Sequence, residues 1–304
     1  AHMEVPVTGI RTLPLLAILV LIGCSGGGSD GYAELTLTEQ NAQSVAAQGV
    51  GALAVLEQTT GMVDGFSGVF ADPEMLEVPC SSGQAAVTIN DMVPEGELST
   101  GDSASIRFMS CGIGLGSDAV ILSGAISFVV NEASGSEGGP FSYSLTVSFD
   151  DFSMALPGGS FLVDGGFTMA VSSTDGTTLT SLVYGDYLTI VAQGEGVTFS
   201  GTLSEFREER TYNNDTWAYS YELQATVASS LIGGKVVYHT TAPFTGTDPD
   251  APDTGSMDVT GANGGILTIN AVDSTDVQLV LDSDADGTPE ATINTTWAYL
   301  DSVQ

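Results

Sequence analysis

Positive charge is the scarcest property of this 304-residue sequence. It has five Lys and Arg residues against 38 Asp and Glu, which gives a formal net charge of −33 at pH 7. Proteins that bind nucleic acid neutralise its phosphates with a basic surface, so we expect no nucleic-acid partner. Charged residues nevertheless make up only 14% of the chain and hydrophobic residues 42%. This composition excludes a disordered acidic tail and predicts a folded protein.

Residues typical of catalytic sites are also scarce. We interpret Ala1-His2-Met3 as the remnant of an expression tag, which leaves His239 as the only other histidine. A Ser-His-Asp arrangement could therefore use only His239, which lies in an apparent strand. The sequence contains no phosphate-binding loop and no zinc-ligand spacing. We expect a non-enzymatic protein, with a carboxylate-dependent glycoside hydrolase as the least favoured alternative.

The N-terminal segment combines one positive charge with a short apolar run. Arg11 precedes the run from Leu13 to Ile22, which has the length of the apolar part of a signal peptide. A transmembrane helix would need about 20 such residues. The run ends in Leu21-Ile22-Gly23-Cys24. This sequence resembles the lipobox of bacterial lipoproteins, in which an aliphatic residue stands three places before the cysteine and a small residue directly before it.

The resemblance implies cleavage before Cys24 and a covalent lipid on that cysteine, whose acyl chains hold the protein to a membrane. Ser25, rather than Asp, follows the cysteine, which favours the outer membrane, at its periplasmic or its surface face. Residues 1–23 would then be the tag remnant and signal peptide, and residues 24–31 the lipidated cysteine with a Gly/Ser tether. Residues 32–304 are predicted to form a single β-rich domain.

The remaining cysteines are Cys80 and Cys111. An even number of cysteines in an oxidising compartment predicts a disulfide between them. The alternative is two buried thiols that stay unpaired.

The periodicity of apolar residues changes along the chain. From Thr38 to about Val63 small apolar residues recur at three- and four-residue steps, which predicts a long helix with Thr38 as its N-cap. After Cys80 the apolar residues alternate, and turn sequences such as Pro157-Gly158-Gly159 separate the segments. We therefore predict an α+β fold, with one long N-terminal helix on a large twisted antiparallel β-sheet. The sheet is a meander, with a half-barrel as one alternative.

The predicted strands are residues 86–89, 105–108, 120–128, 141–149, 161–171, 179–191, 197–206, 217–227, 235–241, 266–269, 277–281 and 291–294. Residues 248–254 are predicted to form an acidic, Pro-rich loop. The segment from Glu205 to Arg210 is interpreted as the self-neutralising end of a hairpin or as a partner contact.

The most specific local motif runs from Asp282 to Glu290. Asp282, Asp284 and Asp286 alternate, a glycine follows at position 287, and Glu290 stands ninth. The segment resembles the first nine positions of an EF-hand calcium loop, in which the carbonyl of Thr288 would be a further ligand. The twelfth position is an isoleucine, so the resemblance implies at most a weak structural Ca²⁺ site between strands. The alternative is a solvated acidic turn.

Three functions fit these observations. The first is a non-enzymatic envelope lipoprotein with a structural or an adhesive, ligand-binding role. The second is a carrier of an apolar ligand such as a lipid, similar to the localisation lipoproteins, with a groove between helix and curved sheet. Phe167, Met169, Tyr184 and Phe199 are candidates to line this groove, and the alternative is that they belong to the core. The glycoside hydrolase is the third. The membrane is a partner through the lipid anchor, and a protein or lipid ligand is an additional expectation.

Overall fold

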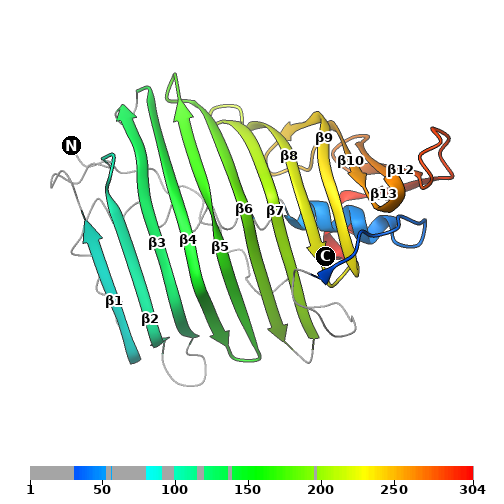
Figure 1. Ribbon diagram of the computed structural model, residues 1–304. Helices are drawn as coiled ribbons and strands as arrows, with labels where there is room; N and C mark the ends of the chain where they lie inside the picture. The colour runs from blue at the N-terminus through cyan, green and yellow to red at the C-terminus, as the bar shows by residue number, and fades with distance from the viewer. Residues whose placement is uncertain are drawn as a thin grey trace.

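The computed structural model describes residues 31–52, 56, 80–90, 99–114, 120–135, 139–194 and 197–303. They form one antiparallel sheet of thirteen strands, in which every strand pairs with its neighbours in the sequence (Figure 1). The strands are β1 (Ser82–Asn90), β2 (Ser103–Ile113), β3 (Val120–Gly135), β4 (Phe141–Leu156), β5 (Gly159–Ser173), β6 (Thr178–Gly194), β7 (Val197–Asn213), β8 (Ala218–Ser229), β9 (Gly234–Thr247), β10 (Thr254–Thr260), β11 (Ile266–Ala271), β12 (Asp276–Asp282) and β13 (Ala291–Thr296).

Alternation of apolar and polar residues gives the sheet one buried and one polar face. In β4, Val147 is fully buried and lies opposite Phe128 of β3 and Phe167 of β5. The intervening Thr146 and Ser148 point to the other face, because successive side chains of a strand alternate. The same pattern continues in β11 and β12, where Leu267 and Leu279 are fully buried. The prediction that the region after Cys80 consists of alternating strands is confirmed.

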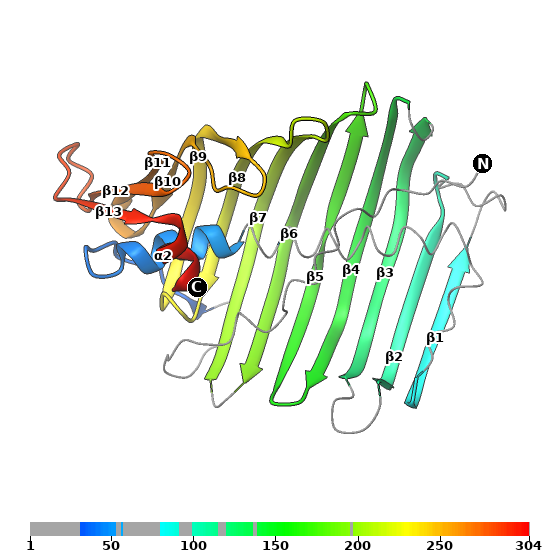
Figure 2. The same cartoon turned by 180° about the vertical axis from the view of Figure 1, so that it is seen from behind.

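The long strands bend where bulges interrupt their pairing. Register shifts coincide with positive φ angles at Ser110 (52°), Gly124 (88°), Asp151 (47°) and Glu205 (49°). Such bulges insert an unpaired residue and increase the local twist. They lie in β2, β3, β4 and β7, within the broad layer of long strands that Figures 1 and 2 show.

An N-terminal helix packs against the C-terminal part of the sheet. Residues 42–52 are helical, and residue 56 is helical as well. Ala42, Val45 and Ala46 are buried, and the hydroxyl of Tyr238 in β9 donates a hydrogen bond to the Val45 carbonyl oxygen at 2.6 Å. A Cβ added at Gly49 would lie 2.7 Å from the ring of Tyr238. Small residues therefore let the helix approach the sheet closely.

The predicted α+β class, with a long helix lying on the sheet, is wrong. The described residues form mostly strands, with short helices beside β8–β13 (Figure 2). The helix of residues 42–52 spans about 16 Å at 1.5 Å per residue. Thirteen strands cover about 58 Å at their usual spacing of about 4.8 Å. The helical residues that the structure describes therefore cover only part of the width of the sheet. The predicted helix residues 53–55 and 57–63 lie outside the described residues.

The C-terminal third differs from the prediction in two further places. Strand β10 (Thr254–Thr260) was missed, because it starts where the acidic, Pro-rich loop was predicted to end. The helix α2 (Trp297–Ser302) follows β13 directly, and its N-cap Thr296 accepts a hydrogen bond from the Tyr299 amide. The sheet stays open, with β1 and β13 at its ends.

The predicted disulfide is confirmed. Cys80 and Cys111 are bonded and lie 31 positions apart in the sequence. The bond joins Cys80, two residues before β1, to Cys111 of β2, so it fixes a strand at one end of the sheet to its neighbour. Among the residues that the structure describes, no helix is both long and apolar enough to span a membrane.

Candidate functional site

The acidic segment from Asp282 to Glu290 connects β12 to β13 and forms a hairpin loop. Its carboxylates converge: one oxygen from each of Asp282, Asp284, Asp286 and Glu290 lies within 4.8 Å of the others. The sequence motif therefore brings together the four acidic residues that it predicted as metal ligands. Asp284, Asp286 and Glu290 are exposed, and Asp282 is half-buried.

Backbone amides hold the carboxylates of this loop in place. The Gly287 amide donates to Asp282 Oδ2 at 2.9 Å, and the Ser283 amide donates to Glu290 Oε2 at 2.6 Å. Gly287 has φ = 84°, a conformation that a glycine adopts without steric cost. The Thr288 amide donates to Asp286 Oδ1 at 2.7 Å, so Thr288 lies in the same loop. Its proposed role as a carbonyl ligand stays a prediction.

The electrostatics of the loop differ from one carboxylate to another. The nearby charge of Asp286 raises the pKa of Asp284, because ionising both groups brings like charges together. The hydrogen bond from the Ser283 amide lowers the pKa of Glu290, because it stabilises the ionised form. A divalent cation would relieve the repulsion around Asp284. Carboxylate oxygens are the ligands that Ca²⁺ prefers, so the chemistry of the four donors fits this ion.

The residues proposed to line an apolar groove do not lie together. Phe167 and Met169 are 3% and 2% exposed and belong to the core. Tyr184 is 45% exposed and lies opposite Thr168, on the other face of the sheet. Phe199 is half-buried beside Gly201, to which its ring is close. One groove between helix and sheet cannot contain all four side chains.

The polar face of the sheet carries rows of hydroxyl groups that bond across strands. Asn131 Nδ2 donates to Thr146 Oγ1 at 2.9 Å, and the hydroxyls of Thr146 and Thr168 lie 3.2 Å apart. Thr189 and Thr202 repeat this contact at 3.2 Å between β6 and β7. These pairs use up part of the hydrogen-bonding capacity of each hydroxyl, which can both donate and accept. The donors and lone pairs that these contacts leave unused are open to solvent or to a ligand.

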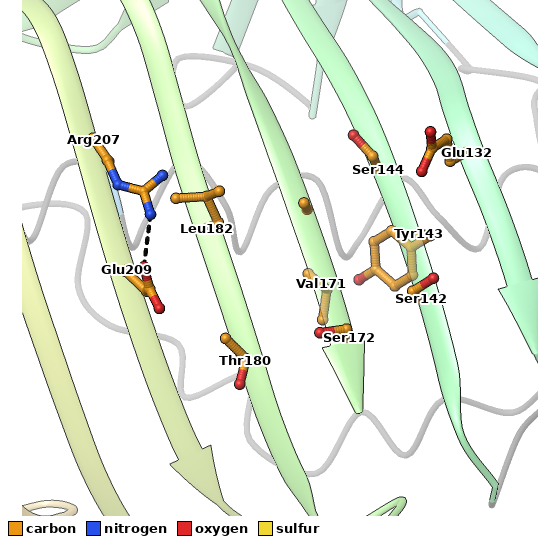
Figure 3. Close-up of a pocket in the computed structure, with 11 residues that line it drawn as sticks. Glu132, Ser142, Tyr143, Ser144, Val171, Ser172, Thr180, Leu182, Arg207 and Glu209 are labelled. Atoms are coloured by element: carbon orange, nitrogen blue, oxygen red, sulfur yellow. Dashed lines mark hydrogen bonds and ion pairs between the residues drawn. The ribbon is translucent and has the colours of Figure 1, made fainter. Parts of the chain in front are cut away.

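A shallow trough of about 380 Å³ lies on this polar face over β3–β7 (Figure 3). One cross-strand row runs through it and consists of Glu132, Ser144, Ala170, Leu182 and Glu209. Carboxylates thus stand at its two ends, and small or apolar side chains lie between them. The sequence did not reveal this site, because the row joins five strands whose register is visible only in the structure.

An ion pair forms one wall of the trough. Arg207 Nη2 lies 2.7 Å from Glu209 Oε2, and the two side chains are 50% and 47% exposed. Both belong to the segment from Glu205 to Arg210, which was predicted to end a hairpin. The segment lies instead inside β7, where alternation places Arg207 and Glu209 on the polar face and buries Phe206 and Glu208.

The residues outside the described part of the chain include Cys24, so the lipobox stays a prediction.

Comparison with family models, with curated proteins and with solved structures finds no match to this chain.

Proposed function

We propose that this protein is a non-enzymatic lipoprotein of the bacterial cell envelope that acts as an adhesive or ligand-binding module. The lipid on Cys24 would hold it to the outer membrane, and the Gly/Ser tether of residues 25–31 would separate the membrane from the folded domain. A surface with a formal charge of −33 opposes adsorption to anionic lipid headgroups, so the acyl chains would provide the membrane affinity.

The observation that carries the proposal is the broad polar face of the sheet. Long antiparallel strands such as β4, β6 and β7 present Ser and Thr hydroxyls in cross-strand register, and the opposite side chains form the core. An extended face of fixed polar groups suits contact with a large partner better than enclosure of a small molecule. The disulfide and a Ca²⁺ ion in the acidic loop would stiffen the two ends of this sheet.

A lipid carrier receives less support from the fold. A carrier needs a concave apolar site, whereas Phe167 and Met169 are core residues and Tyr184 lies on the polar face. The two functions are separated by purifying the Cys24→Ser chain, extracting it with organic solvent and measuring bound lipid by mass spectrometry. We expect no stoichiometric lipid. One lipid molecule retained per chain would contradict the binding-module proposal and favour the carrier.

A further inference from the structure

We propose that the trough over β3–β7 binds a neutral oligosaccharide that lies across the strands. The inference rests on the proposed binding function and names the class of its ligand. It is drawn from the row between Glu132 and Glu209, from the Arg207–Glu209 pair and from the charge of the chain.

The shape of the trough favours an extended ligand. Glu132 and Glu209 are four strands apart in one row, which corresponds to about 19 Å at the usual strand spacing. Ala170 and Leu182 lie in the middle of the row and make the floor of the trough partly apolar. A compact molecule would contact only part of such an open trough, whereas a chain of linked rings could contact all of it.

The polar groups of the trough match the hydroxyl groups of a sugar. Ser142, Ser172 and Thr180 line it beside the central row, and each hydroxyl can donate and accept hydrogen bonds. The paired Arg207 and Glu209 present a charged donor and a charged acceptor side by side, 2.7 Å apart. Two adjacent hydroxyls of a sugar ring can accept from the guanidinium and donate to the carboxylate at once. Charge-assisted hydrogen bonds of this kind are stronger than neutral ones.

An exposed aromatic ring adjoins these groups. Tyr184 follows Leu182 on the same face of β6 and lies directly opposite Arg207. Its side chain is 45% exposed. The apolar face of a sugar ring can stack on such a ring while its hydroxyls reach the neighbouring polar groups.

Charge and backbone pairing argue against two other ligands, an acidic polysaccharide and an extended peptide. Arg207 is already neutralised by Glu209, and Glu132 adds a further negative charge, so an acidic polysaccharide would be repelled. An extended peptide binds a sheet by pairing with a free strand edge. The trough lies over β3–β7, whose backbones pair with strands on both sides, and therefore offers side chains only.

The test measures binding of the full chain, solubilised in detergent, to two panels of oligosaccharides. The neutral panel contains hexasaccharides of glucose, galactose, mannose and N-acetylglucosamine, and the acidic panel contains oligomers of glucuronate and galacturonate. We expect binding to at least one neutral hexasaccharide and none to the acidic panel. Arg207→Gln and Tyr184→Ala should each weaken binding about tenfold, the usual effect of losing one strong contact.

Two matched variants control for changes in fold and surface. Arg107→Gln removes an exposed arginine of β2 that lies outside the trough. This arginine pairs with Asp150 of β4 at 3.6 Å. Tyr299→Ala removes a tyrosine of similar exposure, 44%, on α2. Both should bind like the wild type. The inference is overturned if no neutral hexasaccharide binds, if the acidic panel binds more tightly, or if the control variants lose as much affinity as the trough variants. Lipid attachment at Cys24 and absence of bound lipid test the proposed function separately, so its failure can be distinguished from failure of this inference.

Discussion

Removal of one buried hydroxyl tests how the N-terminal helix is held on the sheet. Tyr238 is fully buried, and its hydroxyl donates to the Val45 carbonyl oxygen at 2.6 Å. Burial raises the pKa of Tyr238, so the hydroxyl stays protonated and remains a donor. The change Tyr238→Phe keeps the ring and removes this hydrogen bond. Losing a buried hydrogen bond costs about 1 to 2 kcal/mol, and the melting temperature of a domain of this size should fall by roughly 2 to 6 °C.

The assay is urea unfolding followed by circular dichroism. We expect a lower midpoint with an unchanged slope, since the surface exposed on unfolding stays the same. Tyr299→Phe is the matched control, because Tyr299 is 44% exposed; substitutions at such surface positions change stability by about 0.5 kcal/mol or less. If Tyr238→Phe were as stable as this control, the helix would not be held by the contact that the structure gives.

The other predictions concern the acidic loop and the disulfide. Millimolar Ca²⁺ should raise the melting temperature, and Asp284→Asn combined with Asp286→Asn should abolish most of the rise; an equal response to Mg²⁺ or to Na⁺ at matched ionic strength would indicate screening only. The raised pKa of Asp284 means that the folded loop holds a proton more tightly than an unfolded chain does. The stabilisation by Ca²⁺ should therefore be complete at pH 7 and decline on acidification at a pH above the ordinary aspartate value of 3.8. Calorimetry at several pH values measures this decline. A decline only below that value would contradict the repulsion from Asp286. Replacing Cys80 and Cys111 by Ser should lower the free energy of unfolding by about 3 to 4 kcal/mol, the loop-closure contribution of a 31-residue separation. Unfolding of both forms at the same urea concentration would rule this out.

The strand prediction succeeded because burial of one face imposes a two-residue period. Twelve of the thirteen strands correspond to predicted segments. β10 was missed because Asp248, Pro249 and Pro252 dominate the preceding residues and suggest a loop. Bulges such as those at Asp151 and Glu205 could not be predicted, since both residues adopt positive φ angles that non-glycine residues seldom show.

The candidate sites differ in how far the sequence determines them. The acidic loop was found because its carboxylates lie within nine consecutive residues, and a short turn suffices to bring them together. The trough depends on the register between β3 and β7, which joins Glu132 to Glu209 across 77 positions of the sequence. The same dependence on register decides between the groove and the core interpretations. Phe167 and Met169 belong to the core, whereas Tyr184 pairs with Thr168 on the opposite face.

The central claim is that the protein is a lipid-anchored envelope protein, and the most direct measurement is the mass of its N-terminal peptide. The chain is produced in a bacterium that processes lipoproteins, digested with protease and analysed by mass spectrometry. The account predicts that the peptide begins at Cys24 and carries a diacylglycerol thioether and an N-acyl group, and that Cys24→Ser yields neither the cleavage nor the lipid. An unmodified Cys24 within an uncleaved chain, or normal membrane fractionation of the Cys24→Ser variant, would contradict it.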